Sequence, residues 1–218
     1  MLATATVPVY WHTISAAGGA GRLSGTAIDQ QITILNHAYA PVGLKFELAE
    51  VEDAVNTEWF YQVAPDSQEQ TAMKKALRKG GADALNIYST ELSDSMRPIR
   101  GYATYPWRYR FAESDDGVVL RYTETGNLTA VHEVGHWAGL YSTYENGCSG
   151  PGDMVDDTPA QAFASSGCPE GRDTCSQRGT DPIHNFMDGN EDTCRNQFTP
   201  GQVERAREVL RVFRGIAT

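Results

Sequence analysis

The chain has 218 residues, of which 40% are hydrophobic and 21% are charged, and its formal net charge is -10. This composition is ordinary for one globular domain or for two lobes that share a core, and no apolar run approaches the roughly 18 residues that would span a bilayer, which argues against a membrane partner. The acidic balance repels phosphate backbones and argues against nucleic acid as a partner.

The first part of the chain alternates between strand and helix patterns. Strands are predicted at 7–14, 44–51, 84–88, 101–105 and 117–122. A helix is predicted at 26–39, where apolar residues recur at helical spacing and Thr26 is the expected cap. A second helix is predicted at 68–77, before Gly80-Gly81. This alternation predicts an α+β fold in which a mixed β-sheet is backed by two helices.

Two more helices are predicted in the rest of the chain. The third covers 128–140, with apolar residues along one side. The last covers 200–213 and begins with Thr199 as its cap and Pro200 at its first helical position. The long stretch between them is rich in turn-forming residues, so we expect loops there.

The cysteines lie in the last third of the chain. They are Cys148, Cys168, Cys175 and Cys194. Their even number, without a CxxC pair, predicts two disulfides rather than a zinc knuckle, and the sequence allows three pairings. Disulfides indicate an oxidising compartment, so we expect a secreted protein, although no signal peptide precedes the strand at 7–14. We expect one domain over 1–218, with an N-terminal lobe at 1–140 and a loop-rich, disulfide-bonded C-terminal lobe at 141–218.

The predicted helix at 128–140 contains the HExxH pattern His132-Glu133-Val134-Gly135-His136. Residues four apart on a helix project from the same face, so both imidazoles can bind one zinc ion. Glu133 lies next to the first histidine, where it can take a proton from metal-bound water as a general base. Because zinc lowers the pKa of that water towards about 7, the pattern predicts a metal-dependent hydrolase.

Further motifs give the chain a specific resemblance to a known family. The run from His132 to Tyr141, with Gly139 at the turn, resembles the start of the HExxHxxGxxH motif of the metzincins, and Asn185-Phe186-Met187-Asp188 resembles their Met-turn. The stretches 101–107, 116–119, 147–159 and 167–169 resemble the pappalysin group, especially its fungal and bacterial extracellular members. This resemblance covers nearly the whole chain and implies a two-lobed, metzincin-like zincin whose active-site helix forms the floor of a horizontal cleft.

The resemblance implies three further features. It suggests the disulfide pairs Cys148–Cys175 and Cys168–Cys194. It suggests calcium near Asp153, Asp156 and Asp157, since calcium binds clustered carboxylates, although aspartates are also typical of turns. It also suggests that the strand at 101–105 forms the upper rim of the cleft and pairs with an extended peptide substrate.

Two positions depart from the pattern of the family. The third zinc ligand of the family is a histidine six residues after the second, and here that position is Ser142, whose neutral hydroxyl is a weaker ligand than imidazole. The family carries a tyrosine two residues after the Met-turn methionine, which resembles an oxyanion stabiliser, and here that position is Gly189. The alternatives for a replacement ligand are His184, Glu145 and Asp153. The preferred expectation is that zinc keeps His132 and His136 and is completed by water or substrate.

The sequence therefore predicts a zinc-dependent metalloendopeptidase-like hydrolase with Glu133 as general base. In this interpretation His132 and His136 bind zinc, Ser142 is a weak or lost third ligand, and Met187 lies beneath the metal. The expected cofactors are Zn2+ and Ca2+, and the expected partner is a peptide or protein substrate. Two alternatives stay open: a remodelled metal enzyme that acts on a small molecule, and a proteolytically inactive homologue that binds peptides or proteins. Restoring the imidazole at position 142 and the phenol at position 189 is expected to raise peptidase activity.

Overall fold

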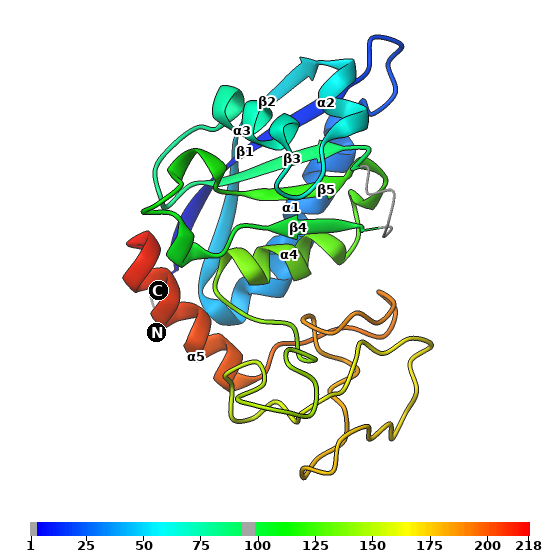
Figure 1. The fold of residues 1–218 in the computed structure, drawn as a ribbon. Helices are drawn as coiled ribbons and strands as arrows, with labels where there is room; N and C mark the ends of the chain where they lie inside the picture. The colour runs from blue at the N-terminus through cyan, green and yellow to red at the C-terminus, as the bar shows by residue number, and fades with distance from the viewer. Residues whose placement is uncertain (1–3, 93–98) are drawn as a thin grey trace.

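A five-stranded, mostly parallel sheet forms the upper part of the molecule in the computed structural model, which describes residues 4–92 and 99–218 (Figure 1). The strands are β1 (Ala5–Ser15), β2 (Leu44–Val55), β3 (Leu85–Thr90), β4 (Gly101–Ala103) and β5 (Val118–Arg121). Their order is β2-β1-β3-β5-β4, and only β4, at one edge, runs antiparallel to its neighbour. The prediction of a mixed sheet is therefore confirmed.

Helices surround this sheet and continue into the lower part of the molecule. They are α1 (Gly25–Tyr39), α2 (Thr57–Gln62), α3 (Gln68–Leu77), α4 (Thr129–Trp137) and α5 (Pro200–Val209). Short 3-10 helices lie at Ala40–Val42, Pro106–Arg108, Glu113–Asp115 and Tyr122–Glu124, and a π-helical turn, Leu210–Arg214, follows α5. No helix in the described residues has both the length and the apolar character needed to cross a membrane.

Both faces of the sheet are covered by helices. On one face, α1 and α4 pack against β1 in the main core cluster, which includes Trp11, Leu35 and Val131. On the other face, α2 and α3 contribute Phe60 and Met73 to a second cluster. Because the sheet is covered on both sides, every residue of the central strand β3 is buried, as is usual for parallel strands between helix layers.

The sequence predicts most of the helices and strands, but it misses α2 and misplaces some helix ends. Helix α3 begins and ends at the predicted residues. Ser24 caps α1 instead of Thr26, since the Ser24 side chain accepts a hydrogen bond from the Ala27 amide. The six-residue helix α2 is too short to show a helical period, so the pattern misses it. Helix α4 ends at Trp137 because Gly139, with a φ of +91°, turns the chain away.

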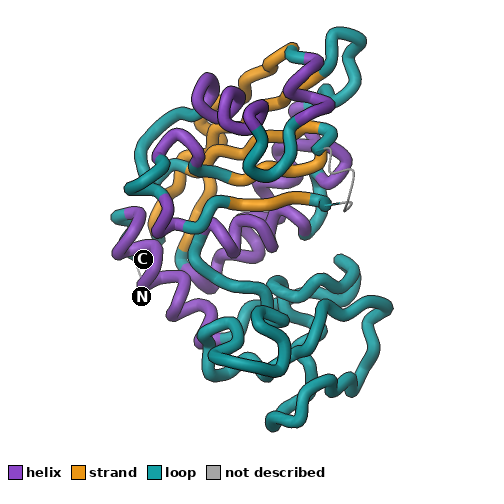
Figure 2. The backbone as a smooth tube through the Cα atoms, in the orientation of Figure 1, coloured by secondary structure: helices purple, strands orange, loops and turns teal. Residues whose placement is uncertain are grey.

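The segment between α4 and α5 forms the lower part of the molecule and is drawn almost entirely as loop in Figure 2. Its only ladder contact is an isolated bridge between Asn185 and Gln197. Two disulfides, Cys148–Cys175 and Cys168–Cys194, cross-link it. The loop-rich C-terminal lobe and both implied disulfide pairs are therefore confirmed.

The last helix brings the chain back to the sheet. It starts with the capping box of Thr199 and Gln202, so the predicted cap is confirmed. After α5, the Arg214 guanidinium makes two hydrogen bonds of 2.9 Å with the buried Asp116 carboxylate, which precedes β5. The same guanidinium lies 3.8 Å from the centre of the Trp137 indole, at the end of α4. These contacts anchor the C-terminal end of α4.

Candidate active site

Helix α4 lies between the edge strand β4 and the loop-rich lower part of the molecule (Figure 1). It carries His132, Glu133 and His136. The four-residue spacing brings the two imidazole rings together, with centroids 4.7 Å apart and planes at 86°. His132 and Glu133 line a cavity of about 210 Å³. One helical turn thus presents two metal-binding nitrogens and a carboxylate at the same place.

Main-chain carbonyls hold the Nδ1 atom of each imidazole. In His132 this nitrogen lies 3.0 Å from the carbonyl oxygen of Phe186, and in His136 it lies 2.9 Å from that of Leu140. Donation from Nδ1 fixes the tautomer and leaves the Nε2 lone pair for a metal ion. Burial lowers the pKa of both histidines, so both rings are neutral at neutral pH, as metal ligands must be.

Ser142 approaches His132 from the turn that follows α4. Gly139 makes this turn possible, because a Cβ there would lie 2.4 Å from a methyl group of Val209. The Ser142 hydroxyl lies 3.5 Å from Nε2 of His132. Within residues 4–92 and 99–218, no Asp, Glu, Cys or further His joins His132 and His136 in a metal-binding group. The donor set of two imidazoles and one hydroxyl suits zinc, with the hydroxyl as its weak member.

Glu133 is buried beneath the edge strand. A Cβ added to Gly101 of β4 would lie 2.9 Å from Cγ of Glu133, so the strand passes directly over this side chain. Burial raises the pKa of Glu133 to about 8, and the positive charge of Arg195 opposes the rise. A carboxylate with raised proton affinity at the wall of a cavity is suited to general-base chemistry.

Met187 packs under the active-site helix. A Cβ on Gly135 would lie 2.3 Å from its sulfur atom, so only glycine allows this approach. The Met187 amide donates a hydrogen bond of 2.8 Å to the Asn185 side chain. Asn185 in turn exchanges two side-chain hydrogen bonds with Gln202 of α5. The turn that carries Met187 thereby supports α4 from below.

The position two residues after Met187 is closed to a large side chain. A Cβ at Gly189 would lie 2.8 Å from the Cβ of Ala164. Ala164 lies between Gln161 and Ser165, and both of these residues donate hydrogen bonds to the buried carboxylate of Asp188. These hydrogen bonds hold the loop that carries Ala164, so Ala164 cannot readily move. A tyrosine introduced at position 189 therefore also requires a smaller residue at position 164.

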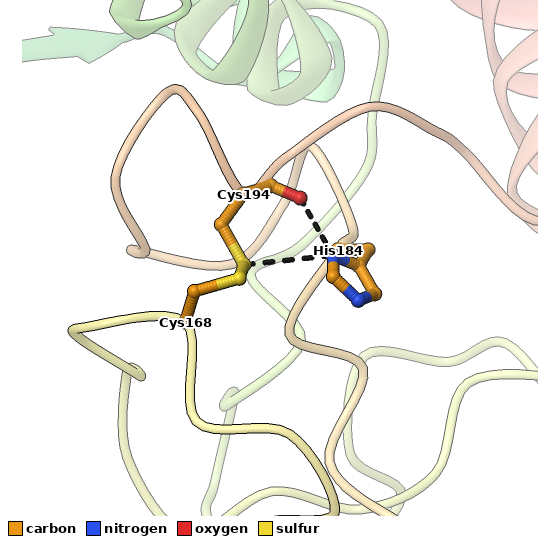
Figure 3. A group of neighbouring side chains, drawn as sticks. All are labelled: Cys168, His184 and Cys194. Atoms are coloured by element: carbon orange, nitrogen blue, oxygen red, sulfur yellow. Dashed lines mark hydrogen bonds between the residues drawn. A yellow bond between two sulfur atoms is a disulfide. The ribbon is translucent and has the colours of Figure 1, made fainter.

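Two of the three side chains considered as replacement ligands, His184 and Asp153, have other partners, and Glu145 does not join His132 and His136 in a metal-binding group of the described residues. Figure 3 shows His184 beside the Cys168–Cys194 disulfide, where its Nδ1 lies 2.7 Å from the carbonyl oxygen of Cys194. These three side chains converge as metal ligands would, but the two sulfur atoms are bonded to each other and supply no thiolate. The Thr158 hydroxyl donates to the Asp153 carboxylate and lies 2.7 and 2.8 Å from its two oxygens.

Two of the three aspartates expected to bind calcium, Asp153 and Asp157, make internal hydrogen bonds. Asp153 is buried against Thr158, as described above. The carboxylate of Asp157 accepts a hydrogen bond of 2.9 Å from the Gly201 amide in the first turn of α5. Asp156 is exposed. Among the described residues, these three carboxylates do not form a metal-binding group, so the structure favours their role in turns and capping.

Asp157→Ala is expected to lower the free energy of unfolding by about 1 kcal/mol, because it removes a helix cap. For a chain of this size the melting temperature then falls by about 2–4 °C. Thermal denaturation with and without calcium measures the change, and the exposed Asp156→Ala variant is the control. If calcium raises the melting temperature of wild type but not of Asp157→Ala, these carboxylates bind calcium and the capping interpretation is wrong.

Three residues at the site escape the sequence analysis. Tyr105 follows β4, and its hydroxyl lies 3.3 Å from Nδ1 of His136. Arg195 is buried beside the cavity and donates to the carbonyl oxygens of Phe186 and Asp188. Tyr144, two residues after the Ser142 position, lines the cavity with Glu133. In the sequence, each is marked only by its position near a motif. Tyr105 lies in the 101–107 stretch, Arg195 follows the last cysteine, and Tyr144 lies in the turn after α4.

The chain is similar to known metallopeptidases over most of its length. A family model described as pregnancy-associated plasma protein-A (Peptidase_M43) matches residues 81–211. An extracellular metalloprotease of Pyricularia oryzae is 46% identical, covering 96% of this chain and 76% of the relative. One from Neurospora crassa is 43% identical, covering 99% and 78%. Among solved structures, mature mirolysin of Tannerella forsythia in complex with a cleaved peptide matches with a TM-score of 0.81 at 27% identity, covering 95% of this chain and 92% of mirolysin.

Proposed function

Since the chain belongs to the pregnancy-associated plasma protein-A family of metzincin metallopeptidases, we propose that it is a zinc metalloendopeptidase centred on His132, Glu133 and His136. The observation that carries this proposal is the convergence of two imidazoles, each with Nδ1 held by a carbonyl, beside a buried carboxylate on one turn of α4. The relatives named extracellular metalloproteases, and the mirolysin complex with a cleaved peptide, support peptide or protein as the substrate class.

Each residue of the site has a separate role in peptide hydrolysis. Zinc, when bound, supplies a Lewis acid and lowers the pKa of a water molecule towards about 7. His132 and His136 would hold the ion through Nε2, and Ser142 would add a weak oxygen donor. The Glu133 carboxylate accepts the proton of the attacking water and then donates it to the leaving amine, because a general base can act as the acid of the second step.

Strand β4 supplies the surface along which an extended substrate can bind. It is an edge strand, and β5 is its only strand partner among the described residues. Its first residue, Gly101, lies over Glu133. A peptide that adds to this edge by main-chain hydrogen bonding would therefore run past the carboxylate. We infer that β4 is the upper rim of the substrate cleft.

The proposal extends to location and cofactors. Extracellular relatives and two disulfides support secretion, since such bonds persist in oxidising compartments. Zinc is the expected cofactor. Calcium stays a prediction from the family resemblance, which the hydrogen bonds of Asp153 and Asp157 do not favour.

Removal of the metal is expected to abolish peptide hydrolysis, and added zinc is expected to restore it. The measurement is the rate of casein hydrolysis during titration with a zinc chelator, with elemental analysis of the protein at each point. About one zinc per chain, lost in parallel with activity, supports the metalloendopeptidase. A protein that binds no zinc and cleaves no peptide is instead the inactive binding homologue. A protein that needs zinc but hydrolyses only small esters or amides is the remodelled enzyme.

A further inference from the structure

The Tyr144 hydroxyl lies where the Met-turn faces the cavity. Tyr144 belongs to the turn after α4, and its ring lines the same cavity as His132, Glu133 and Gly189. Its hydroxyl oxygen lies 3.8 Å from the point that a Cβ of residue 189 would occupy. A phenol therefore stands over Gly189, although it comes from a different segment of the chain.

Three tyrosines of the upper part of the molecule have hydroxyls that are held inside the protein. The hydroxyls of Tyr39, Tyr102 and Tyr109 donate to acceptors inside the protein, at Val131, Gln70 and Glu113 respectively. Those contacts explain why these tyrosines are there. Tyr144 lines the same cavity as Glu133, and Ser142 is a hydrogen-bond neighbour of its hydroxyl. A neutral phenol in such a place is an available hydrogen-bond donor.

Gly189 lies against the small side chain of Ala164. Ala164 fills the space next to Gly189, with its Cβ 2.8 Å from where a Cβ of residue 189 would be. The hydrogen bonds from Ser165 and Gln161 to Asp188 keep that loop against the Met-turn. The loss of a side chain at 189, the small neighbour at 164 and the phenol at 144 therefore fit together as one packing arrangement.

We propose that Tyr144 is a catalytic residue whose hydroxyl donates a hydrogen bond to the oxyanion that forms on the scissile carbonyl. It would supply from the turn after α4 the phenol that Gly189 cannot supply from the Met-turn. This inference rests on the proposed peptidase function and deepens it, because it names the group that stabilises the transition state. A preorganised donor of this kind typically contributes a factor of about 10²–10³ to kcat.

The test is Tyr144→Phe, which keeps the ring and removes only the hydroxyl. Peptide hydrolysis is measured with matched Tyr61→Phe, an exposed tyrosine on α2, as the control. We expect kcat to fall about 10²–10³-fold with KM changed less than about threefold, since the contact forms only in the transition state. The affinity for a phosphinic peptide, which mimics the tetrahedral intermediate, should fall by a similar factor in calorimetry. Zinc content and melting temperature should equal those of wild type.

A rescue experiment guards against an indirect effect. In the Tyr144→Phe background, the double change Gly189→Tyr with Ala164→Gly moves a phenol back to the Met-turn and removes the obstructing methyl group. Relative to Tyr144→Phe alone, we expect this variant to raise kcat and the affinity for the phosphinic peptide at least about tenfold.

The outcomes separate the role of Tyr144 from the function itself. If wild type hydrolyses peptides and Tyr144→Phe matches it in kcat and in phosphinic-peptide affinity, the role of Tyr144 is wrong and the peptidase function stands. Loss of zinc from Tyr144→Phe also overturns the role, because it would make this residue a metal-site component. If wild type hydrolyses no peptide with zinc present, the proposed peptidase function is wrong, and the role of Tyr144 that rests on it is wrong as well.

Discussion

Glu133→Gln is expected to lower peptide hydrolysis by a factor of about 10²–10⁴ while zinc stays bound. Glutamine has nearly the shape of glutamate, so it can occupy the same space below Gly101. It cannot accept a proton, which removes the general base and the later proton donor in one step. The measurement is kcat on a peptide substrate, with zinc content determined on the same samples.

The Glu58→Gln variant provides a matched control for this loss. Glu58 lies in the first turn of α2, away from the cavity and exposed. Its replacement by glutamine should leave kcat within about twofold of wild type. Equal activity in wild type and Glu133→Gln would mean that the measured hydrolysis does not use this site. A contaminating peptidase or a different centre would then be the explanation.

The sequence predicts the part of the site that lies on one helix. The spacing of His132 and His136 is a local property, because four residues make about one turn, and the two rings do lie together. The turn at Gly139 is equally local, since its positive φ favours glycine. The sequence likewise places a hydroxyl, and not an imidazole, at position 142. The geometry of a motif that lies on a single helix can be predicted without knowing the rest of the fold.

The parts that come from several segments are not predictable in this way. Asp157 caps α5 although 44 residues separate it from Gly201. Asp188 is fixed by donors from the loop that carries Ala164. Tyr144 reaches Gly189 only because the turn after α4 folds back on the Met-turn. Such contacts depend on how loops pack, and the loops of the lower part have no periodic pattern from which that packing could be inferred.

The two departures from the family pattern therefore have different consequences. At position 189 the structure offers a phenol from another segment, since the Tyr144 hydroxyl lies 3.8 Å from the point that a Cβ of residue 189 would occupy. At position 142 it offers no comparable substitute, since no carboxylate, thiolate or further imidazole of the described residues joins His132 and His136. The hydroxyl of Ser142 lies near Nε2 of His132 but is a poor zinc donor. We infer that metal affinity, more than transition-state stabilisation, is the weak property of this site.

Ser142→His is expected to tighten zinc binding by at least about tenfold. Even a residue that only orients a ligand is typically worth 10–100-fold in metal affinity, and an added imidazole binds the ion directly. The position is suited to the change, because the Ser142 oxygen is already 3.5 Å from Nε2 of His132. The measurement is a competition titration with a zinc chelator of known affinity, and hydrolysis is measured at limiting and at saturating zinc.

The two zinc concentrations separate occupancy from chemistry. If Ser142 weakens only the binding of zinc, Ser142→His gains activity at limiting zinc and little at saturating zinc. The Ser142→Ala variant, which removes the hydroxyl, should bind zinc no more tightly than wild type. An unchanged zinc affinity in Ser142→His would mean that residue 142 does not face the ion, contrary to its position beside His132. A gain at both concentrations would mean that the third imidazole also holds the ion where Glu133 and Tyr144 can act on the substrate.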